Sequence, residues 1–207
     1  MNDTVLINIF IIISIILTAG YFFGRRRNRA VAAGAINTLI NLMKPAEQKI
    51  TNIGGLVGYH VEMHFHGRGN VEMAHGTMTL LPRHSLLYLP VSRIFRKFDR
   101  FFITFTLREP PTGKEAHIYE KRFHNRYRKN EGKRFRRKEA GLGSGEFIFL
   151  FESGEDLDYL EKLAAGLEDT DRLKEVSIHP DLNVIELLIV PTSGENRLLE
   201  SILHRSF

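Results

Sequence analysis

The stretch from residue 5 to residue 23 reads VLINIFIIISIILTAGYFF and carries no charged side chain. As an α-helix it spans roughly 28 Å, which is close to the thickness of about 30 Å of the hydrocarbon core of a bilayer. Tyr21, Phe22 and Phe23 close the stretch, and aromatic side chains favour the membrane interface. The sequence therefore predicts a transmembrane helix over residues 5–24, after a short extracytoplasmic N-terminus of residues 1–4.

Positive charge follows the apolar stretch directly, in Arg25, Arg26, Arg27 and Arg29. A cleaved secretory signal carries its positive charge before the apolar stretch, so we expect an uncleaved anchor instead. Basic residues that flank a membrane span stay in the cytoplasm. We therefore expect a single-pass protein of the cell membrane with its N-terminus outside and its C-terminal domain in the cytoplasm.

The composition outside the anchor is that of a folded protein. Roughly 180 residues remain there, enough for one sizeable core or two small ones. Charged residues make up 26% of the chain and apolar residues 43%, which is typical of globular proteins. The chain has no cysteine, which excludes disulfides and thiolate chemistry. Its net charge of +5 favours an anionic partner, either nucleic acid or lipid headgroups.

Hydrophobic periodicity predicts a juxtamembrane helix over residues 25–50, because Val31, Ala35 and Leu39 recur at helical spacing. We expect Pro45 to end or kink this helix. Residues 51–207 are then predicted to form a cytoplasmic globular domain of the α+β class, with strands and helices in mixed order.

Alternating hydrophobicity predicts a β-hairpin from residues 56–65 and 71–81. A basic helix is expected over residues 85–100, with Ser85 as its N-cap. Its expected buried face consists of Leu86, Leu89, Ile94 and Phe98. Further strands are expected at residues 101–107, 117–123, 146–152, 174–179 and 184–190, and further helices at residues 153–168 and 194–204.

Histidine and glutamate side chains gather on the polar face of the hairpin. His60, Glu62, His64 and His66 alternate along the first strand, and His75 is predicted to lie near Glu62. Imidazole and carboxylate groups can ligate zinc. Same-face neighbours on one strand are about 7 Å apart, however, so convergence on one ion needs special rotamers. We therefore predict no metal here and interpret this face as a solvent or interface surface.

No motif in the sequence indicates catalysis. The chain has no Gly-x-Ser-x-Gly nucleophile elbow, no phosphate-binding Gly-x-x-x-x-Gly-Lys and no His-Glu-x-x-His. The glycine-rich residues 141–145 lack a following lysine, and we interpret them as a flexible joint. We expect neither enzymatic activity nor a cofactor nor a small-molecule substrate.

Residues 119–140 are the most biased segment outside the anchor. Aromatic residues interleave with ten basic residues, which are Lys121, Arg122, Arg126, Arg128, Lys129, Lys133, Arg134, Arg136, Arg137 and Lys138. From residue 120 to residue 138, the only acidic residues are Glu120 and Glu131. This composition predicts a basic arm, either a mobile loop or a helix, whose counter-charge is external.

The partner of this arm is open between three alternatives. Lysine and arginine neutralise nucleic-acid phosphates, and interleaved aromatic rings stack on exposed bases. Anionic lipid headgroups attract the same side chains, and a charge run can also be merely solvated. The ribosome- or RNA-binding set that we predict combines the ten residues of the arm with Arg93, Arg96 and Lys97 of the helix expected at residues 85–100.

Residues 67–107 resemble calumin, a cytosol-facing single-pass protein of the endoplasmic reticulum and a subunit of the PAT complex in the multipass translocon. The resemblance lies in Gly67-Arg68, Glu72-Met73, and Arg83 with Leu86-Leu87. It continues through Arg93, Arg96, Asp99, Ile103 and Thr106. A preceding span and a later strand and helix at residues 146–169 agree with it. The acidic luminal region and the long basic coiled coil of that family have no counterpart here, and residues 110–145 resemble an insertion.

The resemblance implies a short archaeal or other prokaryotic relative without catalytic activity. Such a protein would lie between the ribosome and a Sec-type translocon. It would act with other membrane insertion factors, as a chaperone-like helper, in the insertion of multi-spanning membrane proteins. Calcium binding by a luminal region cannot be carried over, because that region has no counterpart.

Two other classes of function remain open from the residues alone. One is a membrane-anchored scaffold that binds lipid or RNA without any role in translocation. The other is a metal-dependent hydrolase that uses the histidine strand. A stoichiometric metal in the purified protein would favour the hydrolase.

Overall fold

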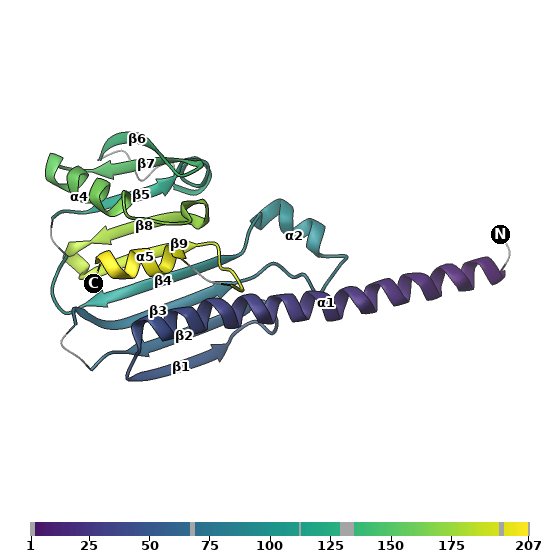
Figure 1. Ribbon diagram of the computed structural model, residues 1–207. Helices are drawn as coiled ribbons and strands as arrows, with labels where there is room; N and C mark the ends of the chain where they lie inside the picture. The colour runs from purple at the N-terminus through teal and green to yellow at the C-terminus, as the bar shows by residue number, and fades with distance from the viewer. Residues whose placement is uncertain (1–2, 67–68, 112, 129–134, 195–196, 207) are drawn as a thin grey trace.

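The computed structural model describes residues 3–66, 69–111, 113–128, 135–194 and 197–206. Its first element is one continuous helix, α1, from Asp3 to Met43. The N-terminal half of α1 extends away from the domain, and the C-terminal half lies along it (Figure 1). The residues of the expected span and of the expected juxtamembrane helix thus belong to one continuous helix, which ends at Met43, shortly before Pro45. The expectation that this helix reaches residue 50 is wrong, because Glu47–Asn52 pairs as a strand.

Nine antiparallel strands form one sheet in the order β1-β2-β3-β4-β9-β8-β5-β7-β6. The strands are β1 (Glu47–Asn52), β2 (Gly58–His64), β3 (Val71–Thr79), β4 (Arg100–Leu107), β5 (Ala116–Glu120), β6 (Arg136–Leu142), β7 (Gly145–Phe151), β8 (Leu173–His179) and β9 (Val184–Ile189). The strands from the first and the last part of the domain thus share a single sheet, in which β4 pairs with β9. The α+β class is confirmed.

Three helices cover one face of this sheet. They are α1, α4 (Gly154–Ala164) and α5 (Arg197–Ser206), and they lie on the same side of the strands in Figure 1. Side chains at alternate strand positions, such as Ile103, Phe105 and Leu187, meet these helices in the main hydrophobic core. Val31, Ala35 and Leu39 of α1 are buried there, as their helical spacing predicted.

The opposite face carries a smaller apolar cluster near β5, β7 and β9. It contains Tyr119, Ile148, Leu150 and Leu188. Phe123 belongs to this cluster and lies in α3 (Lys121–Phe123), which the π-helix η1 (His124–Arg128) follows. Ile148 and Leu150 of β7 are therefore buried on the second face, and β7 packs against apolar clusters on both of its faces.

The remaining helices are short. A helix α2 (Leu89–Arg96) follows β3, and the 3-10 turns η3 (Thr170–Arg172) and η4 (Pro180–Leu182) precede β8 and β9. The helix expected over residues 85–100 is thus shorter than predicted. Its N-cap is Tyr88 and not Ser85, whose carbonyl instead accepts hydrogen bonds from the Tyr88 and Leu89 amides.

The domain holds α1 through a buried polar joint. The Asn28 side chain is fully buried and donates to the carbonyl oxygens of Leu56 and Leu81, at 3.0 and 2.9 Å. Arg83 donates to the Asn28 amide oxygen and forms a two-pronged ion pair with Asp99. These hydrogen bonds satisfy polar groups that would otherwise be costly to bury. The joint fixes α1 to the segment that follows β3.

Candidate functional site

Helix α2 and the residue after it carry three of the predicted basic site residues, at the end of the domain from which α1 emerges (Figure 1). Arg93, Arg96 and Lys97 are all exposed. Contrary to expectation, the apolar side chains beside them are exposed as well, with Ile94 and Phe95 at 69% and 70%. Within α2, only Ser92 is buried. The amphipathic pattern of the sequence is real, but its apolar side does not face the protein core.

The segment before α2 packs on the end of the apolar part of α1. Leu86 lies so close to Gly20 that a Cβ atom on this glycine would approach Leu86 Cδ1 to 2.2 Å. A Cβ atom on Gly24 would lie 2.1 Å from the Arg83 carbonyl oxygen. The Tyr21 and His84 rings meet edge to face at 6.1 Å. The segment that leads into α2 thus lies at the level of the last turns of the predicted span.

The residues of the predicted basic arm that the structure describes belong to the domain and do not form a separate arm. Its first residues form α3 and η1, where Arg122 and Arg126 are exposed. Its last residues form β6, an edge strand whose Arg136, Arg137 and Lys138 pair in register with Phe151, Leu150 and Phe149 of β7. The glycine-rich residues 141–145 form the end of this hairpin rather than a flexible joint. Predicted site residues outside the described part are Lys129, Lys133 and Arg134, together with the side chain of Arg128.

Several of these cations have acidic partners within the domain. Lys121 lies 2.8 Å from Glu139 and 3.0 Å from Glu146, which raises its pKa. Hydrogen bonds from Lys121 and Arg137 lower the pKa of Glu139. Lys138 pairs with Glu161 of α4. The expectation that the counter-charge is external is therefore wrong for Lys121, Arg137 and Lys138. Glu139 lies two residues after Arg137 on the same strand, whereas the fold brings Glu139 and Glu146 to Lys121 and Glu161 to Lys138.

The two predicted basic regions meet at a pair of aromatic rings. Phe98, just after α2, lies 6.5 Å from Phe123 of α3. The Arg100 guanidinium and the Lys174 ammonium lie 5.4 and 5.7 Å from the Phe98 ring centroid, within the range of cation–π attraction. Sequence reasoning left Arg100 and Lys174 out of the predicted site, since Arg100 stands at the end of the helix expected over residues 85–100 and Lys174 is an isolated cation in a strand. Arg100 of β4 and Lys174 of β8 thus meet beside Phe98, which packs together with Phe123 of α3 in the second apolar cluster.

The predicted histidine face is present on β2 and β3, although its membership differs. Ligand atoms of His60, Glu62 and His75 lie within 4.8 Å of one another. His60 contacts Glu62 at 3.4 Å and Thr77 at 3.0 Å through its two ring nitrogens. The cluster contains neither His64 nor His66, which are exposed. Glu62 and His75 are register partners, as predicted.

A second histidine–carboxylate network joins β5, β8 and β9. Glu115 Oε1 lies 3.4 Å from His117 Nε2 and 3.2 Å from His179 Nδ1, and His179 Nε2 lies 3.7 Å from Glu186. His117 is buried and its ring lies 5.1 Å from that of Phe135. Sequence reasoning missed this network. Only the alternation of His117 and Tyr119 along one strand hinted at a shared face.

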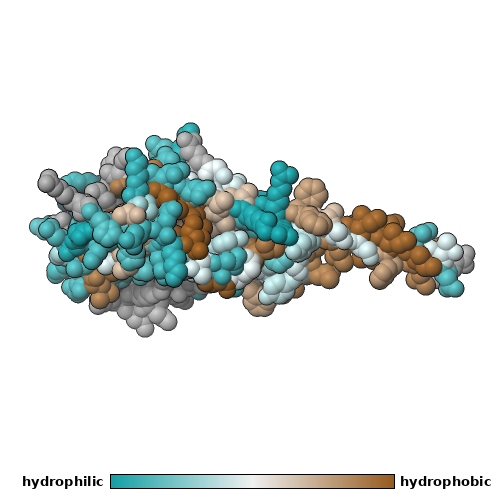
Figure 2. Space-filling view, turned by 90° about the horizontal axis from the view of Figure 1, so that it is seen from below, coloured by the Kyte–Doolittle hydropathy of each residue, from teal (hydrophilic) through white to brown (hydrophobic). Residues whose placement is uncertain are grey.

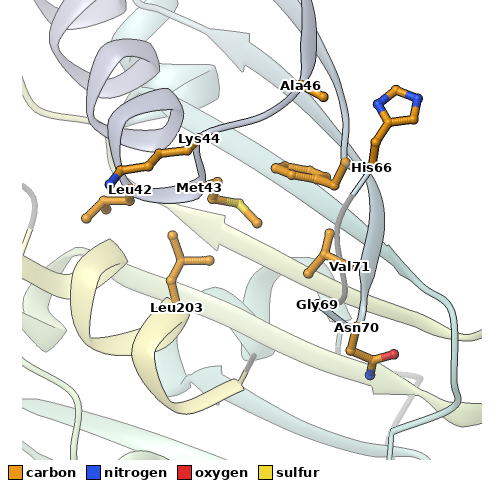
Figure 3. Close-up of a pocket in the computed structure, with 10 residues that line it drawn as sticks. Leu42, Met43, Lys44, Ala46, His66, Gly69, Asn70, Val71 and Leu203 are labelled. Atoms are coloured by element: carbon orange, nitrogen blue, oxygen red, sulfur yellow. The ribbon is translucent and has the colours of Figure 1, made fainter.

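A cavity of about 450 Å³ lies at the end of α1 that is distant from the predicted span. Leu42, Met43, Val71 and Leu203 point into it, and His66 lies at its rim and points away (Figure 3). Its lining is apolar in the middle and polar at the edge, which suits a small apolar group rather than a charged substrate.

The geometry offers three features that can act on a partner. They are the apolar N-terminal half of α1, the half-buried cations Arg100 and Lys174 beside Phe98, and the histidine cluster of β2 and β3. A search of protein-family descriptions and of curated proteins finds no match to this chain.

Proposed function

We propose that this protein is a membrane-anchored factor without catalytic activity, whose domain binds an anionic partner, ribosomal RNA, beside a Sec-type translocon. There it assists the insertion or folding of multi-spanning membrane proteins. The observation that carries the proposal is the continuity of α1: one helix serves as candidate membrane span and as core element of the domain. A domain that is fixed to its anchor in this way stays at a defined height above the bilayer.

The exposed cations support the choice of an anionic partner. Arg122 and Arg126 lie on α3 and η1, and Arg136 lies on the neighbouring edge strand. Their charges neutralise phosphates with release of counterions. The resemblance to calumin supports the choice of the partner complex, a translocon that handles multi-spanning proteins.

The predicted orientation follows from the four arginines after the span. With Arg26 and Arg27 on the cytoplasmic side, the domain faces the ribosome. Figure 2 shows the apolar surface of the protruding part of α1, which contrasts with the mostly hydrophilic domain. This contrast fits a span in lipid and a domain in water.

Co-sedimentation with ribosomes tests the proposal. Full-length protein in an uncharged detergent should pellet with ribosomes at low salt and lose binding as salt rises, with a log–log slope of about −0.7 to −0.9 per phosphate contact. The double variant Arg122→Glu with Arg136→Glu should bind at least about tenfold more weakly, as expected when two cations at a phosphate contact become anions.

The matched control is Lys44→Glu with Lys49→Glu, which changes the net charge equally. Both of these lysines are exposed, at the end of α1 and on β1, the opposite edge of the sheet from β6. The control should bind almost as the wild type does. Equal losses in the two double variants would indicate unspecific attraction, and absence of any binding by the wild type would overturn the ribosome assignment.

A further inference from the structure

Helix α2 exposes a row of large apolar side chains outside the predicted span. Leu87, Tyr88, Val91, Ile94 and Phe95 are each 44–77% exposed. Within the helix, positions 91, 94 and 95 have the i, i+3, i+4 spacing of one helix face. Clusters of exposed apolar side chains on a soluble surface mark an interaction site. This one needs an apolar partner.

The place of α2 in the fold identifies that partner. The segment before α2 packs on α1 at Gly20 and Gly24, through Leu86 and Arg83. Gly20 lies within the apolar stretch, and the arginines begin at Arg25. A span that ends near residue 24 therefore puts the start of α2 at the level where acyl chains meet headgroups.

The charges of α2 fit the same surroundings. By helical spacing Arg93 and Arg96 lie on the side of the helix opposite Val91, Ile94 and Phe95, and Lys97 directly follows the helix. An amphipathic helix that lies in a bilayer interface has this composition, with large apolar residues on one face and lysine or arginine on the polar face. Long basic side chains can reach lipid phosphates while their stems stay in apolar surroundings.

We propose that α2 is an interfacial helix that inserts its apolar face into the bilayer, with Arg93, Arg96 and Lys97 bound to anionic lipid headgroups. It is a second membrane contact beside the span. It gives these three cations a lipid partner in place of the RNA partner that the sequence indicated. The inference rests on the membrane anchoring in the proposed function, but not on ribosome binding. Two contacts, one crossing the bilayer and one lying in it, fix how the domain is rotated on the membrane.

Fluorescence quenching tests this inference, because the chain has no tryptophan of its own. Three single-tryptophan variants of the full-length protein are reconstituted in vesicles of anionic lipid whose acyl chains are brominated near the headgroup. Phe95→Trp reports on α2, Phe22→Trp reports on the span, and Leu182→Trp is the control. Leu182 is 69% exposed, in the turn before β9.

The expected result is that bromolipid quenches Phe95→Trp and Phe22→Trp, each by about twofold or more, and leaves Leu182→Trp bright, because an interfacial helix lies about 5–10 Å deep. Adding Arg93→Glu, Arg96→Glu and Lys97→Glu to Phe95→Trp should reduce its quenching in anionic vesicles. In zwitterionic vesicles the same three changes should have little effect.

Other outcomes contradict the inference. Emission from Phe95→Trp that is shifted to the blue but not quenched would show that protein, such as a second copy of the chain, covers α2. Quenching no stronger than in Leu182→Trp would show that α2 stays in water. An unquenched Phe22→Trp would remove the anchoring itself. Because the vesicles contain no ribosomes, none of these results depends on RNA binding.

Discussion

The Arg83 guanidinium donates a hydrogen bond to the Asn28 amide oxygen at 3.0 Å, across a separation of 55 residues in the sequence. Arg83 also holds Asp99, whose carboxylate accepts from the Leu81 amide at 2.7 Å. These side chains connect α1 to the start of β4 through groups with almost no exposure to water. Helix α1 and the sheet are therefore coupled by a network of hydrogen bonds between buried and half-buried side chains.

Replacement of Asn28 by alanine should weaken this coupling. The change takes a donor from the carbonyls of Leu56 and Leu81, of which Leu81 keeps the Arg83 amide, and it removes the acceptor of the Arg83 guanidinium. The loss should cost about 1–3 kcal/mol of unfolding free energy. Thermal unfolding of the detergent-solubilised protein measures the effect. The matched control is Asn37→Ala on the exposed side of the same helix, which should change stability by only about 0.5 kcal/mol, since alanine favours helices. Equal effects of the two changes would contradict the role of Asn28.

Substitution of Gly24 by alanine should also destabilise the protein. Alanine inside a helix normally gains about 1 kcal/mol over glycine. Here its Cβ would overlap the backbone of Arg83, and such overpacking costs about 1–3 kcal/mol. Gly154→Ala in the first turn of α4 is the control, because the space around its Cβ is open. A lower melting temperature for Gly24→Ala and an unchanged or higher one for Gly154→Ala would confirm that α1 docks at Gly24.

The sequence predicts well those elements whose apolar side chains enter the core. The hairpin of β2 and β3, the strand β4 and the capped helix α4 all form as expected. Their buried residues, such as Val61, Ile103 and Leu160, recur at the spacing of a strand or a helix. The class of fold follows from these elements.

Elements at the edges of the sheet could not be recognised. Strand β1 is exposed along its whole length, and its residues EQKITN lack the alternation of a half-buried strand. It forms because β2 offers backbone partners from Tyr59 to His64. Strand β6 looks like a solvated charge run for the same reason, and its place depends on β7. Pairing between distant segments is not visible in local composition.

The sites show two further limits of local patterns. The amphipathic pattern around Ile94 indicates that this side chain needs apolar surroundings, but it does not indicate whether a protein core or a bilayer provides them. Asn28 would be interpreted as a residue that weakens the helix, whereas the fold gives it buried partners. The partners of Lys121 were equally hidden, because Glu139 and Glu146 come close only through the β6–β7 hairpin.

Asp156 should make the stability of α4 depend on pH. Its carboxylate is buried, which alone would raise its pKa, but hydrogen bonds from Ser153 and from the Lys114 amide outweigh burial and lower the pKa. A lowered pKa in the folded protein means that the stabilisation is present above the ordinary value of about 4 and is lost as the pH falls through the lowered value.

Asp156→Asn should therefore lower stability by about 1 kcal/mol at neutral pH, as loss of a helix cap does, and the difference from the wild type should shrink in acid. Melting temperatures measured from neutral to acidic pH test this expectation. Asp158→Asn on the exposed side of the same helix should show neither effect. A constant difference between Asp156→Asn and wild type at all pH values would mean that packing, not charge, explains the loss.

The histidine cluster on β2 and β3 is predicted to hold no metal. Both ring nitrogens of His60 have partners in Glu62 and Thr77, and the His60 and His75 rings are stacked with their planes only 20° apart. Lone pairs in nearly parallel rings do not converge on one tetrahedral ion. Elemental analysis of the purified protein should therefore find no stoichiometric zinc. Zinc at one per chain that disappears in His60→Gln with His75→Gln would refute this and would revive the metal-dependent hydrolase.

The orientation of the chain in the membrane is the last prediction, and the absence of cysteine makes it accessible. Thr4→Cys places a thiol before the apolar stretch, and Leu182→Cys places one on the exposed surface of the domain. A maleimide that cannot cross membranes should label Thr4→Cys in intact cells, and should label Leu182→Cys only after the cells are permeabilised.

The reason for this expectation is the charge after the span. Arg26, Arg27 and Arg29 are exposed on α1, where they remain free to interact with the cytoplasmic leaflet. Changing all three to glutamate should weaken the bias and allow part of the population to insert with the domain outside, so that Leu182→Cys becomes reactive in intact cells. Labelling of Leu182→Cys in intact cells with the arginines unchanged would reverse the topology. The domain would then never meet a ribosome, and the role at the translocon would have to be abandoned, whereas the membrane contact of α2 would stand on the outer leaflet.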